Sequence, residues 1–347
     1  MTSYMIYAEY IKIANSVVHI VGNKTSDEGL FLSDNLLSLD ENTNQILLKY
    51  LLSPFKSDDY YQMWHESDLS LNEVYTFACK IFEDRNTFLE MSKAFARHLY
   101  AHSNHPKIKR GELCIVYLKN VIVGTTTCDA VGIFKSENKD TFLQIKSEKG
   151  RVIMQSETGI NVNRQDKGCI IFNTQKENGF IVSIVDTTNR QNEAKYWTDE
   201  FLKVRPLSNS YNQTEQLLTI TKEFVSQMPN VDNKIQKVNY INRSVEAFSR
   251  SNVKLEDYSH DVFQDELKER DFAEYTQKRA SEIGITFDKE FEVSSQAVRK
   301  KNVGAMTTIR LDKNFDIHIH GGEQLIEQGF DNEKGMRYYK LYFIEEK

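Results

Sequence analysis

The apolar and polar positions of this chain follow different periods in different segments, and each change of period predicts an element. Residues 11–21 alternate and are rich in β-branched side chains, which predicts one or two strands. Asp40 is placed to cap a helix over 44–52, and Pro54 is expected to end that helix.

A second helix is predicted to begin at Thr87, because Thr87 and Glu90 have the spacing of a capping box. Its apolar residues recur at helical spacing, as expected of one buried stripe. They are Phe88, Met91, Phe95 and Leu99. The helix is expected to end in the polar stretch before Pro106.

The period then becomes two, which predicts an antiparallel, β-rich middle. Short strands alternate with Gly, Asn and charged turns, and no connection is long enough for a crossover helix. The predicted strands are 112–124, 129–137, 141–147, 151–157, 168–174 and 179–188. A short aromatic helix over 196–202 is expected to close this region.

The polar stretch 205–212 contains a proline and is the predicted boundary between two domains. The expected fold class is α+β. The N-terminal domain, 1–205, combines helices with the antiparallel middle, and the C-terminal domain, 206–347, has helices followed by a small antiparallel sheet.

In the C-terminal domain the helices are predicted over 214–283 and the strands over 305–345. Two apolar stripes at helical spacing lie at 217–228 and 235–248. Core packing is the favoured interpretation of these stripes, and a dimer interface is the alternative.

The composition indicates which broad class of protein this is. The 347 residues are 40% hydrophobic and 27% charged, as is ordinary for a soluble folded protein, and no stretch approaches the roughly 20 apolar residues of a membrane helix. The N-terminal segment lacks the pattern of a secretion signal.

The four cysteines form no close pair, which favours reduced thiols in a cytoplasmic protein over a disulfide framework or structural zinc. They are Cys79, Cys114, Cys128 and Cys169.

Two groups of residues resemble metal sites. Asp316, His318 and His320 share one face of a predicted strand and have the chemistry of zinc or non-haem iron ligands, but a solvated strand face is the favoured interpretation. A second pattern has the residue types of a magnesium-dependent nuclease, although its last members fall in a predicted turn. Its members are Asp129, Glu137 and Lys139.

Phosphate-binding loops, dinucleotide fingerprints and nucleophile elbows do not occur in the sequence. We therefore expect a protein that is not an enzyme and that carries no cofactor.

The charge distribution bears on nucleic-acid binding. The chain has 44 basic and 50 acidic residues, so its net charge of −6 excludes a uniformly basic coat. Residues 106–210 are the only part with a positive balance. Two short basic clusters are the candidate phosphate contacts, with solvated turns as the alternative. They are Lys107, Lys109 and Arg110, and then Arg299, Lys300 and Lys301.

Three blocks of sequence, in this order, resemble a known family. The first is the tract 96–113, and the second is Gly132-Ile133-Phe134-Lys135-Ser136-Glu137 followed by Phe142-Leu143. The third combines 311–320 with 335–343. Together with the chain length, these blocks are similar to the bacterial nucleoid-associated proteins of the NdpA family.

The resemblance implies a cytoplasmic protein of the bacterial nucleoid that binds DNA directly or through partners, and it carries over no catalytic residues. Our leading hypothesis is a non-enzymatic homodimer that contacts double-stranded DNA without strong sequence preference. The first alternative is an adaptor that reaches the nucleoid through a protein partner, with the tyrosine-rich C-terminal strand as its docking edge. The second is the metal-dependent nuclease. No membrane partner is expected.

Overall fold

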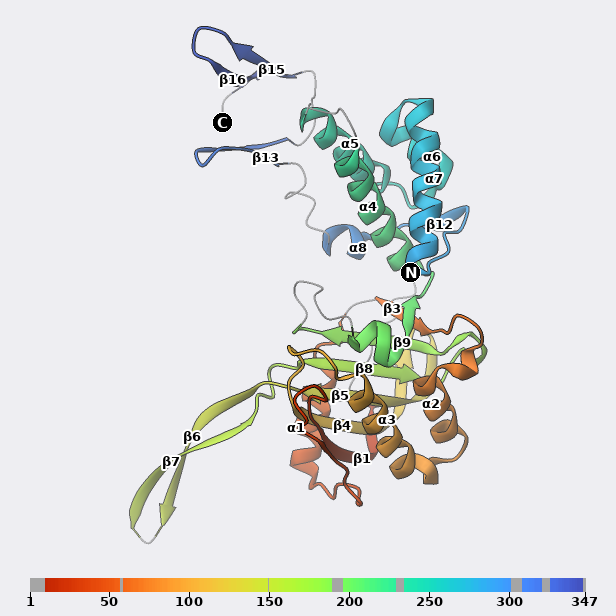
Figure 1. Cartoon of the computed structure of the whole chain (residues 1–347), viewed down its shortest axis with the longest axis vertical. Helices are drawn as coiled ribbons and strands as arrows, with labels where there is room; N and C mark the ends of the chain where they lie inside the picture. Colours follow the sequence, from red (N-terminus) through yellow and green to blue (C-terminus); the bar gives the residue numbers. More distant parts are fainter. Residues whose placement is uncertain are drawn as a thin grey trace. The chain divides into compact units, whose positions relative to one another are not determined.

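The structure is a computed structural model, and it describes residues 10–56, 59–148, 150–188, 196–228, 234–300, 308–319 and 325–345. The chain forms two compact units, Met1–Leu207 and Ser208–Lys347 (Figure 1). Helices and antiparallel strands occur in both units, so the predicted α+β class is confirmed. Whether the two units are domains that fold independently stays a prediction.

An eight-stranded antiparallel sheet is the centre of unit 1, in the order β10-β3-β9-β8-β5-β4-β1-β2. Its strands are β1 (Lys12–Val21), β2 (Leu30–Phe31), β3 (Tyr60–Met63), β4 (Gly111–Val123), β5 (Thr126–Ser136), β8 (Lys167–Phe172), β9 (Ile181–Asp186) and β10 (Val204–Pro206). Strands β4, β5, β8 and β9 confirm the predicted period-two segments. The predicted boundary stretch contributes β10, which pairs with β3.

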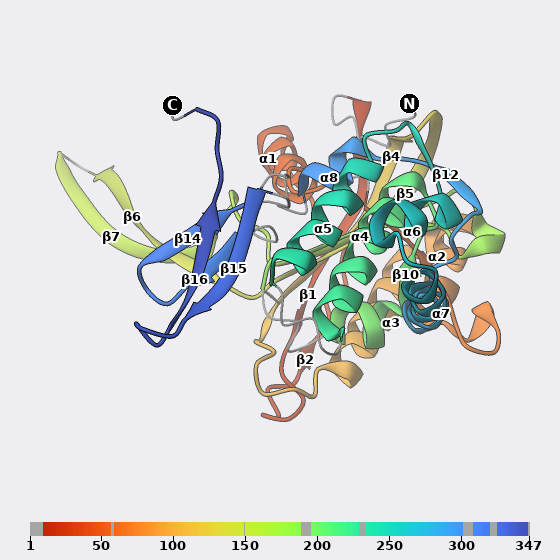
Figure 2. The ribbon, with the colours of Figure 1, turned by 90° about the horizontal axis from the view of Figure 1, so that it is seen from above.

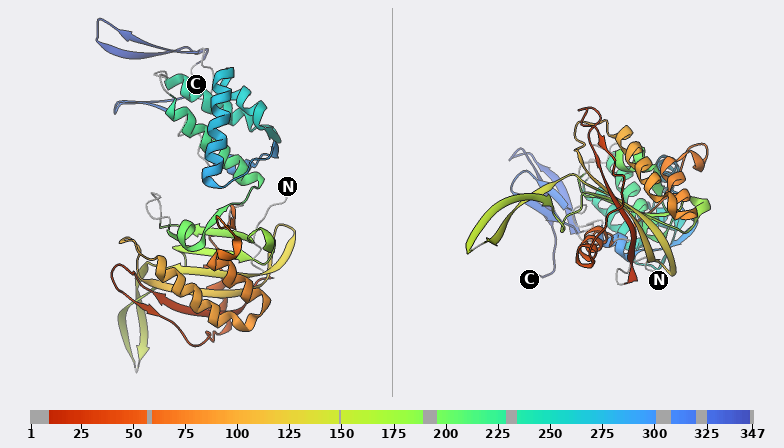
Figure 3. Two further views of the ribbon diagram at one scale, coloured as in Figure 1. Left: turned by 45° about the vertical axis from the view of Figure 1, so that its right-hand side comes forward. Right: turned by 90° about the horizontal axis from the view of Figure 1, so that it is seen from below.

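Helices cover both faces of this sheet, because alternate residues of its strands are apolar on both sides. Along β4, Leu113, Ile115 and Tyr117 pack in one core with α2 (Glu73–Glu83) and α3 (Phe88–His102). The residues between them, such as Val116, pack in a second core with α1 (Glu41–Leu52). Figure 3 shows α2 and α3, in orange, lying across one face of the sheet.

The caps of these helices only partly follow the prediction. Asp40 caps α1 as expected, because its carboxylate accepts a hydrogen bond from the Thr43 N–H at 2.9 Å. The prediction of a capping box at Thr87 is wrong, because the Thr87 side chain makes no capping hydrogen bond to α3. A short 3-10 turn, Arg85–Thr87, precedes α3, and the Thr87 hydroxyl donates backwards to the Asp84 carbonyl at 2.7 Å.

Strands β6 (Lys139–Glu148) and β7 (Arg151–Ile160) were predicted as strands but do not join the sheet. They pair only with each other among the described residues, while β5 pairs directly with β8. The result is a two-stranded ribbon that projects from the sheet (Figure 1), which we call the arm. Its root is the junction 136–139, where β5 ends and β6 begins.

Unit 2 begins with helices around a core of its own. These are α4 (Ser210–Gln227), α5 (Lys234–Ala247), α6 (Leu255–Phe263), α7 (Glu266–Ile283) and α8 (Ser295–Lys300), together with a small sheet of β11 (Asn252–Lys254) and β12 (Glu290–Glu292). Both predicted apolar stripes are buried in this unit, as Leu217 and Ile241 illustrate. The core interpretation is therefore correct, and the dimer-interface alternative for these stripes is wrong.

The C-terminal strands form two separate ribbons rather than one sheet (Figure 2). One consists of β13 (Thr308–Leu311) and β14 (Phe315–His318), and the other of β15 (Ile326–Asp331) and β16 (Met336–Leu341). Ile309 and Ile326 bury one side of the ribbons against Ile235 and Val238 of α5. Across the described parts of the chain, no helix has the length and apolar character needed to cross a bilayer.

Candidate nucleic-acid interface

The first predicted basic cluster lies on the turn between α3 and β4, and the structure holds that turn firmly. Asn23 donates from its amide to the carbonyls of His105 and Ile108, at 2.9 and 2.7 Å. The Arg110 guanidinium donates to the Glu28 carbonyl at 2.6 Å. Lys107, Lys109 and Arg110 are all exposed at this fixed turn.

The turn is joined to the root of the arm. The Lys109 ammonium donates to the Asn138 side-chain oxygen at 2.7 Å, and the buried Lys135 ammonium donates to the Lys109 carbonyl at 2.8 Å. These bonds bring together residues 26 and 29 positions apart in the sequence. The basic turn and the arm root therefore form one surface.

Two further cations belong to this surface. The side chains of Lys139 and Arg164 are 45% and 56% exposed, and each has an acidic neighbour, Glu112 and Asp166 respectively. We call Lys107, Lys109, Arg110, Lys139 and Arg164 the root cluster. The sequence pointed to Lys139 only as part of the nuclease pattern, and it missed Arg164. The positive balance of 106–210 was the only signal for Arg164.

Beneath the root cluster lies a buried ion pair. The Lys135 ammonium is fully buried 2.9 Å from a Glu137 carboxylate oxygen, and the Tyr196 hydroxyl donates to the same oxygen at 2.9 Å. Burial lowers the pKa of Lys135, and the Glu137 carboxylate opposes that shift. Burial also raises the pKa of Tyr196 well above its usual value, and the charge of Glu137 adds to the effect.

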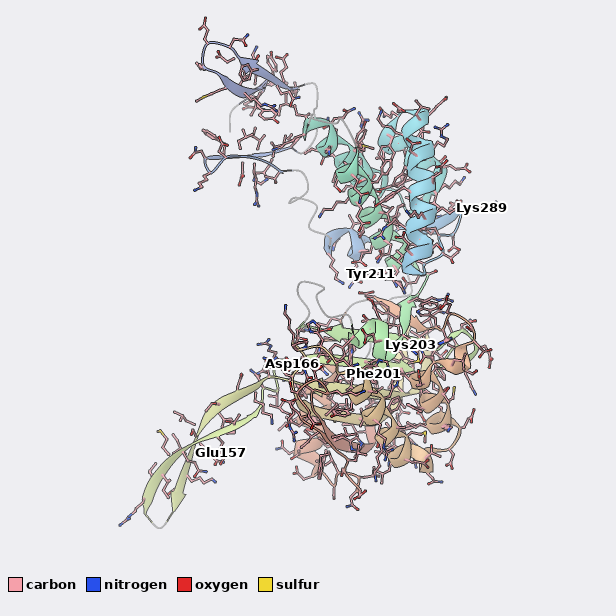
Figure 4. All side chains as sticks on the ribbon, viewed as in Figure 1. Glu157, Asp166, Phe201, Lys203, Tyr211 and Lys289 are labelled. Carbon is pink, nitrogen blue, oxygen red and sulfur yellow. The ribbon has the colours of Figure 1, made fainter. Side chains whose placement is uncertain are left out.

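A second buried group fixes the chain as it enters the arm. Asp166 is almost fully buried and accepts hydrogen bonds from the Glu137 and Asn138 N–H groups at 2.7 and 2.8 Å. Figure 4 labels Asp166 where the arm leaves the sheet. The neighbouring Lys167 donates to both Asp186 oxygens at 2.8 Å. These charged residues are paired and inaccessible, so their role is to hold the root in place.

The second predicted basic cluster belongs to unit 2. Arg299 and Lys300 are exposed at the end of α8, and the Lys300 ammonium lies 5.3 Å from the centre of the Tyr211 ring. Lys301 falls outside the described residues.

The nuclease pattern is not assembled. Asp129 accepts a hydrogen bond from the Tyr117 hydroxyl at 2.6 Å, near the opposite end of β5 from Glu137. A strand rise of about 3.3 Å per residue puts these two carboxylates roughly 26 Å apart, too far to share a metal ion. Lys139 pairs instead with Glu112. The alternative in which these three residues form one metal site is therefore contradicted by their positions.

The other candidate metal ligands have ordinary partners. His318 is hydrogen-bonded to the Thr308 hydroxyl at 2.8 Å, Asp316 lies 3.9 Å from Arg310, and His320 is outside the described residues. The described residues contain no group of three His, Cys, Asp or Glu side chains that could hold a metal.

Cys114 and Cys169 are buried free thiols, and burial raises the pKa of Cys114 to about 12.

The structure thus combines an α+β fold with exposed cations at the root of a projecting ribbon. Residues 17–336 match the NA37 family model, described as nucleoid-associated protein YejK. The chain therefore belongs to this family of nucleoid-associated proteins, and the predicted family is confirmed. A comparison with curated proteins gave no match.

Proposed function

We propose that this protein binds double-stranded DNA directly in the bacterial nucleoid, without sequence readout and without catalysis, and that the root cluster makes the contact. One observation carries the proposal. Lys107, Lys109 and Arg110 are exposed on a turn whose geometry is fixed by bonds to Asn23, Asn138 and Lys135. Fixed cations of this kind contact phosphates and position a duplex without reading its bases.

The charge of the whole chain sets the strength of this interaction. A net charge of −6 repels DNA everywhere except at local basic surfaces, so we propose weak binding that disappears as salt rises. If all five cations of the root cluster neutralised phosphates, the slope of log K against log salt concentration would be about −4.5. Acidic neighbours such as Glu112 reduce that value.

The test is fluorescence anisotropy with a labelled duplex over a salt series, with magnesium present and the DNA checked for cleavage afterwards. The variant Lys107→Gln/Lys109→Gln/Arg110→Gln should bind more weakly and lose up to about 2.7 from the magnitude of the salt slope. The matched control removes three exposed cations of the C-terminal ribbons, as Lys313→Gln/Lys334→Gln/Arg337→Gln. Equal loss in both variants would show a general charge effect and remove the root cluster from the proposal.

The cations at the end of α8 are proposed as a second, auxiliary contact. Arg299 and Lys300 are exposed on a short helix, and Lys301 follows in the sequence. The variant Arg299→Gln/Lys300→Gln/Lys301→Gln should reduce the salt slope less than the root-cluster variant does. The reverse order would transfer the main contact to unit 2.

The exposed edge of the last ribbon supports a second candidate function, an adaptor for a protein partner. Within the described residues β16 pairs only with β15, and three aromatic side chains are exposed on this strand or just after it, namely Tyr338, Tyr342 and Phe343. Such an edge suits the addition of a partner strand. Deletion of 336–347 separates the two functions, since an adaptor would lose nucleoid localisation while its affinity for purified DNA stayed unchanged.

A further inference from the structure

Unit 2 contains a cavity between helices α6 and α7 that the proposed DNA contact does not use. The two helices lie side by side (Figure 2), and residues of the loop after α7 complete the lining. Large apolar side chains in its walls come from Leu255, Phe272, Ile285 and Phe287. The volume of the cavity is about 430 Å³, within the range of roughly 300–1,000 Å³ that is usual for small-molecule sites.

Small side chains on α7 leave this space open. Ala273, Thr276 and Ala280 are separated by three and then four residues, so they lie on one face of the helix. All three belong to the lining of the cavity. A larger apolar side chain at the alanine positions would therefore occupy the volume that is empty here.

Thr276 brings an unpaired polar group to the wall of the cavity. Its side chain is 6% exposed, and its hydroxyl oxygen has no hydrogen-bond partner among the described residues. Threonines within a helix commonly donate to the carbonyl four residues earlier, and Thr214, Thr219 and Thr221 of α4 do so at 2.7, 2.8 and 2.7 Å. A buried hydroxyl without a partner lowers stability, and a bound molecule that hydrogen-bonds to it would remove that cost.

The charge of the lining decides which class of molecule fits. Glu256 is the only charged residue among the described residues that line the cavity, and its side chain is exposed. A phosphate or carboxylate would find no counter-charge there and would be repelled by Glu256, whereas a cationic amine would be attracted. We propose that this cavity binds a small apolar amine, with its ammonium group beside Glu256, its apolar body against Phe272 and Phe287, and a polar group hydrogen-bonded to Thr276.

Three probes of nearly equal size test the charge of the ligand. Tryptamine carries an ammonium group, tryptophol carries a hydroxyl in its place, and indole-3-acetate carries a carboxylate. The ring N–H of each can donate to the Thr276 hydroxyl oxygen. Saturation-transfer difference NMR titrations against the full chain at pH 7 measure the three dissociation constants. Tryptamine should bind most tightly and indole-3-acetate least tightly, and added salt should reduce the difference because Glu256 is exposed.

Variants of three lining residues separate the contributions. Ala280→Leu fills the cavity and should abolish saturable binding of tryptamine. Thr276→Val keeps the shape of the side chain but not its hydroxyl, so tryptamine and tryptophol should both bind about two- to twelvefold more weakly. Glu256→Gln should weaken tryptamine binding about two- to fivefold and leave tryptophol binding unchanged. In urea, Thr276→Val should unfold no more easily than the unmodified chain, because it removes an unpaired buried hydroxyl.

The matched controls change the same residue types outside the cavity. Thr219→Val removes a hydroxyl that already has a partner, and Glu274→Gln removes a carboxylate of α7 that is not part of the lining. Both controls should leave the affinity for tryptamine unchanged. Equal affinity for the three probes, or tryptamine binding that survives Ala280→Leu, would overturn the proposal. So would saturable binding of none of them, which would leave the cavity to a side chain of a protein partner.

Discussion

His19 shows how one buried side chain ties the N-terminal strand to the helical layer. It lies on β1, and its Nδ1 accepts a hydrogen bond from the Ser33 N–H at 3.1 Å. Since Nδ1 is an acceptor, Nε2 carries the proton and donates to the Ser92 hydroxyl of α3 at 3.0 Å. Burial, with the charges of Lys93 and Arg97, lowers the pKa of His19 to about 4.

This arrangement predicts a loss of stability in mild acid. Neutral His19 is favoured in the fold, so its contribution is complete above pH 6.5 and is lost as the pH falls from 6.5 towards 4. The free energy of unfolding should fall by up to about 1.4 kcal/mol per pH unit in that window. Urea unfolding at pH 7, 6 and 5 measures it. His19→Gln can make both hydrogen bonds without titrating, and it should flatten the dependence; equal slopes in both proteins would contradict the assignment.

The buried pair of Lys135 and Glu137 gives a second prediction for single residues. Glu137→Gln leaves the Lys135 ammonium buried without its counter-charge, which should lower the free energy of unfolding by about 3–5 kcal/mol. The folded pKa of Lys135 lies below 10.5, so the buried ammonium loses its proton at a lower pH than it does in the unfolded chain. The loss of unfolding free energy caused by Glu137→Gln should therefore become smaller as the pH rises towards 10.5.

A double-mutant cycle by urea unfolding provides the control for this pair. Lys135→Met/Glu137→Gln removes both charges, and the new amide oxygen can still accept from the Tyr196 hydroxyl. It should be more stable than Glu137→Gln alone. Additive effects would show that the two side chains do not act as a pair.

At the level of elements, the arm root depends on a close backbone approach. A Cβ atom added at Gly111, the first residue of β4, would lie 2.1 Å from the Ser136 carbonyl oxygen, and this neighbour is backbone, which cannot move aside as a flexible side chain could. Gly111→Ala should therefore lower the free energy of unfolding by about 1–3 kcal/mol. Gly159→Ala is the matched control inside the arm, where the nearest atom belongs to the Phe142 ring at 3.2 Å. If both variants unfolded at the same urea concentration, the root would not require glycine.

The sequence predicted most strands of unit 1, because period-two alternation is a local signal. The departure of β6 and β7 from the sheet was not predictable in this way. It depends on β5 pairing with β8, whose residues lie 32 to 42 positions further along the chain than their partners, and on Asp166 accepting hydrogen bonds from the N–H groups of Glu137 and Asn138. Helix α2 was also missed, because its aromatic and β-branched residues are typical of strands while its buried spacing is helical.

The candidate site was predictable only in part for the same reason. Lys107, Lys109 and Arg110 are adjacent in the sequence, so their cluster was visible as a run of charge. Arg164 joins them only through the fold. The burial of Lys135 was not predictable either, because its partner Tyr196 lies 61 residues away.

At the scale of the whole molecule, charge and unit boundaries together predict where DNA affinity resides. Unit 1 contains the root cluster and has a net charge of −2, whereas Ser208–Lys347 has a net charge of −4. A fragment 1–207 should bind a duplex at low salt and keep most of the salt slope of the full chain, because the root cluster and the bonds that fix it are all within it and only the auxiliary contact at the end of α8 is lost.

The fragment 208–347 is the natural comparison, because its only predicted basic cluster is the one at the end of α8. Circular dichroism and urea unfolding must first show that each fragment is folded. Anisotropy at matched salt concentrations then ranks them, and we expect the larger slope for 1–207. If 208–347 alone retained the affinity, the DNA contact would lie on the helical unit, and the fixed turn beside the arm would be structural.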